Sequence, residues 1–296
     1  MFTRSPRLAS AALAGALALG SLTVPVPASA APVAAPLAAP LAAPASVQVD
    51  GAVNVRDIGG YTAADGRRVR GGLVYRSASL SEVTDTGVAQ LGRLGLTASV
   101  DFRSGLEVTL SGPDRLPGGV APVAAPIASL SPTLLDLMPE LLQMILADDK
   151  PGEFMAVTYR SFIHDPDTRR RFADTLRRIA AGQGAVLYHC TEGKDRTGVM
   201  TAILLTALGV DKAQVYDDYM RSNEELAEKN EEELAELAKY GIDPALIEPL
   251  LTVRTSYLDA AFDQIKRDYG TFDAFLTQGL GIDAATQAAL RTRLLQ

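Results

Sequence analysis

Hydrophobic and polar positions predict that strands and helices alternate along much of the chain. Short apolar runs bounded by turn residues predict strands at Leu73 to Arg76, Thr97 to Phe102 and Gly184 to His189. Glycine pairs and an Asp-Gly step punctuate the segment before the first of these strands. Residues 53–76 are therefore predicted to form turns and a hairpin that lead into that strand.

Longer segments place apolar residues three or four positions apart, which is the spacing of one face of a helix. They predict helices at Ser81 to Leu94, Leu134 to Leu146, Thr168 to Ala181, Thr197 to Leu208, Lys212 to Ser222, Glu224 to Tyr240, Ser256 to Tyr269 and Ala284 to Leu295. Ser81 is expected to cap the first helix. Strands interleaved with helices are typical of an α/β fold with a parallel sheet flanked by helices, here with a mostly helical C-terminal half.

The predicted helix at Glu224 to Tyr240 is unusually acidic. Leu226, Leu234 and Leu237 lie roughly on one side of it, and glutamates fill most of the remainder. A charge run of this kind favours a solvated surface helix with one packed stripe. The alternative is a mobile cover over an active site.

The N-terminal thirty residues have the pattern of a cleaved secretory signal. Arg4 and Arg7 precede a small apolar stretch, Leu8 to Val24, and Ala28-Ser29-Ala30 offers an A-x-A cleavage site. A single membrane anchor is the alternative, but two prolines end the apolar run at a length marginal for spanning a bilayer. We therefore expect secretion, cleavage near Ala30 and no stable membrane insertion.

The next segment, residues 31–46 (APVAAPLAAPLAAPAS), consists of Ala/Pro repeats without charge or helical periodicity. Repeated proline keeps such a stretch extended, as a semi-rigid tether. The expected organisation is a signal at 1–30, a linker at 31–46 and one catalytic domain at 47–296.

The composition of the whole chain limits the kinds of partner and reaction that are possible for it. The 28 basic and 35 acidic residues give a net charge of -7, which disfavours a nucleic-acid partner and means that an anionic substrate needs a local basic pocket. One cysteine, Cys190, excludes an internal disulfide framework, and two histidines, His164 and His189, cannot supply a histidine metal cluster. We expect no metal and no cofactor in the reaction.

The residues that point to a reaction lie at the end of the third predicted strand. Cys190 opens a short loop and Arg196 closes it, directly before a predicted helix. A strand, a loop and a helix N-terminus in this order gather backbone amides and the positive end of the helix around one point. A planar guanidinium six positions beyond the thiol can bind two oxygens of a bound phosphate. The spacing predicts a phosphate site above a cysteine.

In such a site Cys190 is expected to be a thiolate at neutral pH, ready to attack phosphorus and form a phosphocysteine that water then hydrolyses. Arg196 and the loop amides would stabilise charge on the phosphoryl oxygens. His189 alternates with Cys190 along the strand and points the other way, so we expect it to brace the loop through a backbone hydrogen bond. The sequence around His164 is typical of a turn and a helix cap, so we do not expect His164 to act as a base for the thiol.

These residues resemble the H-C-x5-R-[ST] signature of the cysteine-dependent tyrosine phosphatase superfamily. More narrowly, H-C-x-x-G-K-D-R-T-G is similar to the secreted bacterial tyrosine-phosphatase-like enzymes, also called atypical lipid phosphatases. Further motifs resemble that family in order along the chain, at Asn54 to Gly60, Tyr75 to Ser77 with Leu80, Asp101 to Glu107, Asp218 to Asn223, and Tyr257 to Gly270.

The resemblance implies roles for the loop residues. Cys190 would be the nucleophile, Arg196 the phosphate clamp and Thr197 the hydroxyl that hydrogen-bonds the departing thiolate. The substrate-binding residues would be those of the loop, namely Thr191, Glu192, Gly193 and Lys194, of which Lys194 matches a lysine that phosphoinositide phosphatases also carry. Thr191 and Glu192 depart from the small or apolar residues usual there, and Glu192 adds negative charge at the rim.

Two carboxylates are candidates for the general acid. Asp101 ends a predicted buried strand, and parallel sheets place functional groups at the carboxyl ends of strands. Asp195 lies inside the loop beside Arg196, a placement similar to that in the myotubularins, and is slightly favoured. A salt bridge to Arg103 or Arg56 is the structural alternative for Asp101, and a loop-bracing hydrogen bond is the alternative for Asp195.

The resemblance also implies that helices cover the pocket, with Leu134 to Leu146 and Glu224 to Tyr240 as the candidates for this lid. The expected function is hydrolysis of phosphotyrosine, with phosphoserine, phosphothreonine and phosphoinositides as further substrates. The partners are thus a phosphorylated protein or a phosphoinositide. The alternative is a phosphatase-like protein that binds phosphorylated ligands without turnover.

Overall fold

The computed structural model describes residues 46–128, 151–241 and 243–296. The predicted signal at 1–30, nearly all of the linker at 31–46 and the predicted helix at Leu134 to Leu146 lie outside the described residues. Within the described part of the chain, no helix is long and apolar enough to cross a membrane.

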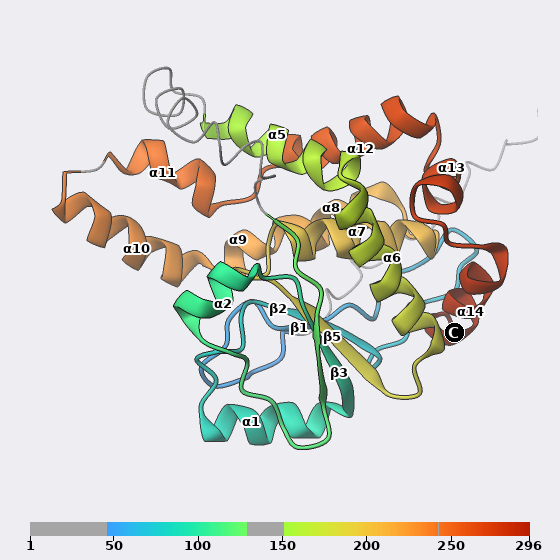
Figure 1. Cartoon of the computed structure of the whole chain (residues 1–296), viewed down its shortest axis with the longest axis horizontal. Coiled ribbons are helices and arrows are strands. Elements are labelled where there is room, and N and C mark those ends of the chain that lie inside the picture. The colour runs from blue at the N-terminus through green and yellow to red at the C-terminus, as the bar shows by residue number, and fades with distance from the viewer. Residues whose placement is uncertain (1–45, 129–150, 242) are drawn as a thin grey trace, which may run out of the picture. The chain divides into compact units, whose positions relative to one another are not determined.

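A five-stranded sheet forms the centre of the fold (Figure 1). The strands are β1 (Arg56–Asp57), β2 (Val74–Ser77), β3 (Leu96–Asp101), β4 (Ala121–Ala124) and β5 (Ala185–His189), in the order β1-β2-β5-β3-β4. The central strands β2, β5 and β3 run parallel, β4 is parallel to β3, and only the edge strand β1 is antiparallel. The predicted parallel α/β sheet is confirmed, with β4 as a strand that the sequence pattern did not indicate.

Side chains alternate between the two faces of the central strand β5, as the period of two in a strand requires. Val186 and Tyr188 enter the large core beneath the helices, whereas Ala185 and Leu187 enter a smaller core. Because both faces are covered, the sequence of β5 is a nearly continuous apolar run and does not alternate between apolar and polar residues.

The helices before the last strand are α1 (Asp85–Leu91), α2 (Gly105–Ser111), α5 (Pro151–His164) and α6 (Pro166–Ala181). Those after it are α7 (Arg196–Ala207), α8 (Lys212–Met220), α9 (Ser222–Glu225), α10 (Ala227–Lys239), α11 (Pro244–Leu251), α12 (Thr255–Tyr269), α13 (Phe272–Ala274) and α14 (Ala284–Leu294). Short 3-10 and π turns cover Gly92–Leu94 and Phe275–Gly279. The mostly helical C-terminal half is therefore confirmed.

The first helix begins later than predicted, because Thr84 rather than Ser81 caps it. The Thr84 hydroxyl accepts a hydrogen bond from Gly87 N at 3.1 Å and donates to the Asp50 carboxylate at 2.6 Å. The Ser81 hydroxyl instead pairs with that of Ser79. The predicted cap beside His164 is correct, since Asp165 accepts from Thr168 N at the start of α6.

Candidate active site

The predicted phosphate loop lies where the sequence placed it, between the end of β5 at His189 and the start of α7 at Arg196. Gly193 adopts φ +66°, and a Cβ at that position would lie 2.2 Å from Ser77 O. Only glycine fits this turn, because it has both the left-handed backbone conformation and no side chain. The loop therefore packs directly against the end of β2.

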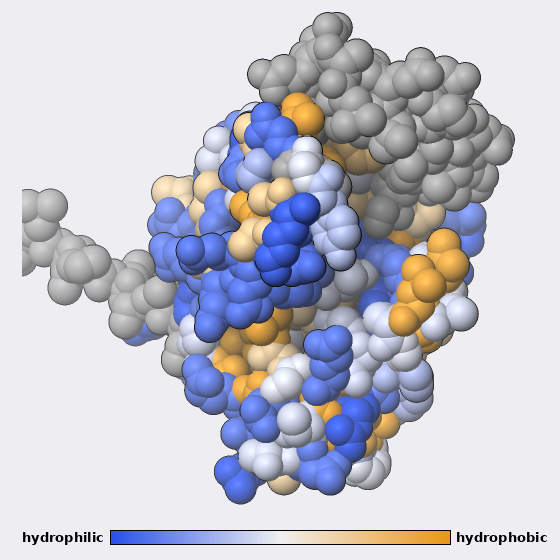
Figure 2. Space-filling model, turned by 90° about the vertical axis from the view of Figure 1, so that its left-hand side faces the viewer, coloured by the Kyte–Doolittle hydropathy of each residue, from blue (hydrophilic) through white to orange (hydrophobic). Residues whose placement is uncertain are grey.

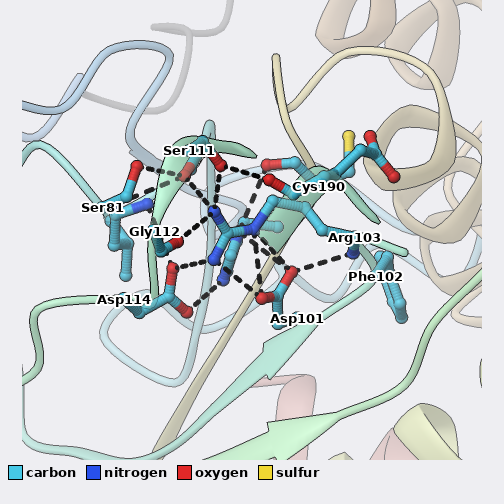
Figure 3. A network of polar contacts seen from close by, with 12 residues as sticks. Ser81, Asp101, Phe102, Arg103, Ser111, Gly112, Asp114 and Cys190 are labelled. Atoms are coloured by element: carbon cyan, nitrogen blue, oxygen red, sulfur yellow. Dashed lines mark hydrogen bonds and ion pairs between the residues drawn. The ribbon is translucent and has the colours of Figure 1, made fainter. Parts of the chain in front are cut away.

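Cys190 is buried under the helices, with 1% of its surface exposed. Figure 3 shows its sulfur pointing away from the polar network on the other side of the strand end. Thr197, in the first turn of α7, is fully buried, and its Oγ1 has no hydrogen-bond partner among the described residues. An unpaired buried hydroxyl is costly, so its position beside the loop calls for a functional reason.

Arg196 is fixed by a carboxylate to which the sequence reasoning assigned no role. Glu107 Oε1 lies 2.6 Å from Arg196 Nη2, and Glu107 Oε2 lies 2.8 Å from Nη1. Glu107 belongs to α2, where it also forms a capping box with Ser104. Burial alone would raise the pKa of Glu107, but the hydrogen bonds and charge of Arg196 lower it to about 2.

This ion pair leaves one edge of the guanidinium available. Nη1 also donates to Phe102 O and Ile127 O, and Nη2 makes a long contact of 3.4 Å with the Thr191 hydroxyl, whereas no acceptor among the described residues contacts Nε. Burial would lower the pKa of Arg196, but the negative charges of Cys190 and Glu107 raise it above its usual value. The Nε and Nη2 edge is thus suited to two oxygens of one anion beside Cys190.

Asp101 lies at the carboxyl end of β3, as predicted, but in a dense ion-pair network (Figure 3). Arg103 Nε lies 3.0 and 3.1 Å from the two Asp101 oxygens, and its Nη2 lies 2.8 Å from Asp101 Oδ2 and 2.8 Å from Asp114 Oδ1. His189 completes the network, with Nε2 2.7 Å from Asp114 Oδ2 and Nδ1 3.2 Å from Cys190 O. The expected bracing contact of His189 with backbone is present, together with a carboxylate partner.

Asp101, Asp114 and His189 also place ligand atoms within 4.8 Å of one another, close enough to hold a metal ion. The buried Arg103 guanidinium already contacts both carboxylates. A cation bound there would have to displace it, so the donor set is that of an ion-pair network rather than of a metal centre.

Asp195 has a neutral partner instead of a cation. Tyr159 of α5 donates to Asp195 Oδ1 at 2.7 Å, and Tyr219 of α8 donates to the Tyr159 hydroxyl at 2.7 Å. Tyr159 is fully buried, and burial together with the charge of Asp195 raises its pKa well above the usual value. The bracing hydrogen bond that was the alternative to an acid role for Asp195 is therefore present, and it comes from α5, an element that the sequence pattern did not predict.

The rim residues contact the helices that follow α9. Glu192 pairs with Lys229 of α10 at 2.7 Å, and buried Lys194 donates to Leu250 O at the end of α11 at 2.6 Å. The Thr191 hydroxyl donates to Glu107 Oε1. The acidic helix is thus a surface helix that also contacts the loop. The face on which it lies is mostly hydrophilic, with small apolar patches (Figure 2).

Comparison with known proteins agrees with this geometry. The family model described as the tyrosine phosphatase family matches residues 47–296. The chain belongs to the tyrosine phosphatase family. The resemblance stated from the sequence motifs is confirmed.

Individual members of the family are similar over most of the chain. A protein of Cupriavidus necator that bears the provisional name of a tyrosine-protein phosphatase is 38% identical over 234 residues, which are 78% of this chain and 83% of that protein. The triple specificity protein phosphatase PtpB of Mycobacterium tuberculosis is 32% identical over 277 residues, 84% of this chain and 98% of PtpB. The crystal structure of P. aeruginosa TpbA in complex with pTyr aligns at a TM-score of only 0.35 and 19% identity, over 62% of this chain and 80% of that one.

Proposed function

We propose that this protein hydrolyses phosphotyrosine through a phosphocysteine intermediate, and that it also acts on phosphoserine, phosphothreonine and phosphoinositides. The observation that carries the proposal is the arrangement of Cys190 and Arg196 across one short loop, with Glu107 fixing the guanidinium. The names of the relatives support the substrate class, since PtpB of M. tuberculosis is called a triple specificity phosphatase.

In the first step the Cys190 thiolate attacks phosphorus, and the bond from phosphorus to the leaving oxygen breaks. Arg196 Nε and Nη2 bind two phosphoryl oxygens, and the loop amides bind the others. The leaving oxygen takes a proton from a carboxylic acid at the pocket. The products are the free alcohol or phenol and phosphocysteine.

In the second step a water molecule attacks the phosphocysteine, and the same carboxylate accepts the water's proton. The bond between sulfur and phosphorus breaks, which releases inorganic phosphate and restores the thiolate. Thr197 is suited to donate a hydrogen bond to the departing sulfur, because its buried hydroxyl has no partner among the described residues.

Asp195 is the better candidate for the acid. Both oxygens of Asp101 already contact the Arg103 guanidinium, so a proton on Asp101 would have to displace that cation. Within the described part of the chain, the Asp195 carboxylate accepts a hydrogen bond only from the neutral Tyr159 hydroxyl, on Oδ1, which leaves its second oxygen able to carry the proton. Asp101 then has the role of an ion-pair partner that positions Arg103.

Two measurements test the reaction. Para-nitrophenyl phosphate should be hydrolysed in the presence of EDTA, whereas a protein that only binds phosphorylated ligands would show no turnover. Cys190→Ser should abolish turnover and keep the binding of phosphate or vanadate. Residual activity of that variant above background would exclude the covalent mechanism.

We also propose that the protein is secreted and cleaved near Ala30. The support is the basic, apolar and A-x-A pattern of residues 1–30. Expression of the full chain in a bacterial host with a Sec pathway, followed by N-terminal sequencing of the protein in the medium, tests this. Retention of the intact N-terminus in the cells would contradict it.

A further inference from the structure

A buried cluster of charges lies beneath the phosphate loop, and the proposed reaction does not use it. Its members come from three separate motifs. Asn54 and Arg56 belong to the motif at Asn54 to Gly60, Arg76 lies in β2, and Asp218 lies in α8. Both arginines are completely inaccessible to solvent, and Asp218 is 1% exposed. Burying three charges is costly unless they are paired in good geometry and hydrogen-bonded.

Asp218 is the shared partner of the two arginines. Its Oδ1 lies 3.1 Å from Arg56 Nε and its Oδ2 lies 2.5 Å from Arg76 Nη1. Burial would raise the pKa of Asp218, but the two guanidinium groups lower it to about 2. One carboxylate thereby fixes the directions of both guanidinium groups.

From this cluster, two side chains reach the loop and bind its carbonyl oxygens. Arg76 Nη2 donates to Gly193 O at 2.7 Å, and Asn54 Nδ2 donates to Glu192 O at 3.0 Å and to Gly193 O at 3.1 Å. Arg56 Nη1 donates to Asn54 Oδ1, which sets the orientation of the Asn54 amide. Asn54 has φ 56° and is the only non-glycine among the described residues with a positive φ.

The direction of these two carbonyls decides the direction of two amides. In a planar trans peptide the C=O and the N–H that share it point to opposite sides. Drawing Glu192 O and Gly193 O towards Asn54 and Arg76 turns the N–H groups of Gly193 and Lys194 to the other side of the loop. Successive amides turned the same way form a concavity that binds anions.

We propose that Asn54 and Arg76 are positioning residues, which aim the amides of Gly193 and Lys194 at the phosphoryl group by holding the carbonyls of the loop outward. Asp218 and Arg56 orient them for this task. The proposal rests on the proposed phosphate site, and it gives a role to motifs of the family that lie far from Cys190 in the sequence.

Asn54→Asp is the sharpest variant, because it keeps the shape and tolerates a positive φ, yet it faces the two carbonyls with an oxygen that cannot donate. Asn54→Gly also keeps the backbone conformation and removes the donor. Gln264→Glu is the matched control, since it makes the same chemical change at a buried amide of α12 that donates to Asp268.

The experiment is calorimetric titration of the full chain with inorganic phosphate, together with kcat and KM for para-nitrophenyl phosphate and the Tm of each variant. Loss of an aimed oxyanion donor typically costs a factor of about 10² to 10³ in kcat. We expect both Asn54 variants to bind phosphate about 10-fold more weakly and to lose about 10²-fold in kcat. Gln264→Glu should lower only the Tm.

Wild-type phosphate affinity in a folded Asn54→Asp or Asn54→Gly protein would overturn the proposal, as would an equal loss of affinity in Gln264→Glu. If Asn54→Asp does not fold, the phosphate affinities of Asn54→Gly and Arg76→Lys test the proposal instead. Arg76→Lys keeps the charge but loses the planar guanidinium with its several donors. A wild-type protein that binds phosphate without hydrolysing para-nitrophenyl phosphate would refute the proposed function, and the phosphate affinities would still test the positioning role.

Discussion

Glu107 and Arg196 form a bidentate ion pair, with oxygen to nitrogen distances of 2.6 and 2.8 Å, although 89 positions separate them in the chain. The pair occupies one edge of the guanidinium and leaves the Nε edge for an anion. It ties the capping box of α2 to the first residue of α7. Phosphate binding is therefore expected to depend on a helix that contains no residue of the loop.

Glu107→Gln should lower kcat/KM for para-nitrophenyl phosphate by about 10²-fold, because a guanidinium misplaced by about 1 Å loses that much in rate. The steady-state rate constants test this. Glu248→Gln is the matched control, since Glu248 pairs with Arg254 at 2.6 Å on the surface of the molecule. Wild-type kcat/KM in Glu107→Gln would contradict the role of the pair.

Stability should fall in acid through the same carboxylate. The folded-state pKa of Glu107 is about 2, below its usual 4.5, so its contribution is present above about pH 4.5 and is lost as the pH falls toward 2. The free energy of unfolding in urea, measured between pH 6 and pH 2, should therefore decrease through this window. Glu107→Gln should show a flatter decrease, and an unchanged slope would refute the assignment.

The general acid can be identified from leaving groups. Asp195→Asn should steepen the dependence of kcat on leaving-group pKa, because loss of the acid hurts alkyl phosphates far more than aryl phosphates with good leaving groups. Asp101→Asn, which disturbs the Arg103 network, should lower kcat without this steepening. A series of phosphate esters provides the measurement. A steepened slope only in Asp101→Asn would reverse the assignment, and no steepening in either variant would exclude both.

Lys194→Ala should cost more on a phosphoinositide with a further phosphate than on a phosphotyrosine peptide. A charge-assisted contact contributes about 1.5 to 3 kcal/mol, which is about 10-fold or more in kcat/KM. To contact the further phosphate, Lys194 Nζ must give up its hydrogen bond to Leu250 O. Lys212→Ala, at an exposed lysine paired with Asp259, is the control. Equal losses on both substrates would mean that Lys194 only shapes the loop.

The ion pair between Glu192 and Lys229 joins α10 to the loop, so its removal tests whether α10 covers the pocket. A partly exposed ion pair contributes at most about 1 kcal/mol, so Lys229→Ala should speed inactivation of Cys190 by peroxide about two- to fivefold. Lys239→Ala, which removes a pair with Glu236 within the same helix, is the control. Equal inactivation rates in wild type and Lys229→Ala would refute a cover formed by α10. The other lid candidate, Leu134 to Leu146, lies outside the described residues.

Local signals were enough for the strand, loop and helix that carry Cys190 and Arg196. The apolar run before the loop is buried on both faces, and a helix begins at the arginine, so each feature follows from neighbours in sequence. Predictions at some element starts were less accurate. Ser81 and Thr84 can both cap a helix, and the contact of Thr84 with Asp50, 34 positions away, favours Thr84.

Several elements had no clear local signal. The helix α5 begins with Pro-Gly, which is typical of a turn, yet it carries Tyr159 to Asp195. The edge strand β4 is only four residues long and contains a proline, so it forms only because β3 offers it a partner. Packing against the rest of the fold outweighs local propensity at both places.

The sequence by itself determined which chemistry we propose for this protein, because the candidate nucleophile, a guanidinium and the loop between them lie within seven consecutive residues. Only the tertiary structure decided what fixes that chemistry in place. Glu107, Tyr159 and Asn54 reach the loop from distant elements, and their contacts depend on which strands and helices become neighbours. The motifs marked the segments of Glu107 and Asn54 as family features, but spacing along a chain does not determine contacts that form only when β2 and β3 pair on either side of β5.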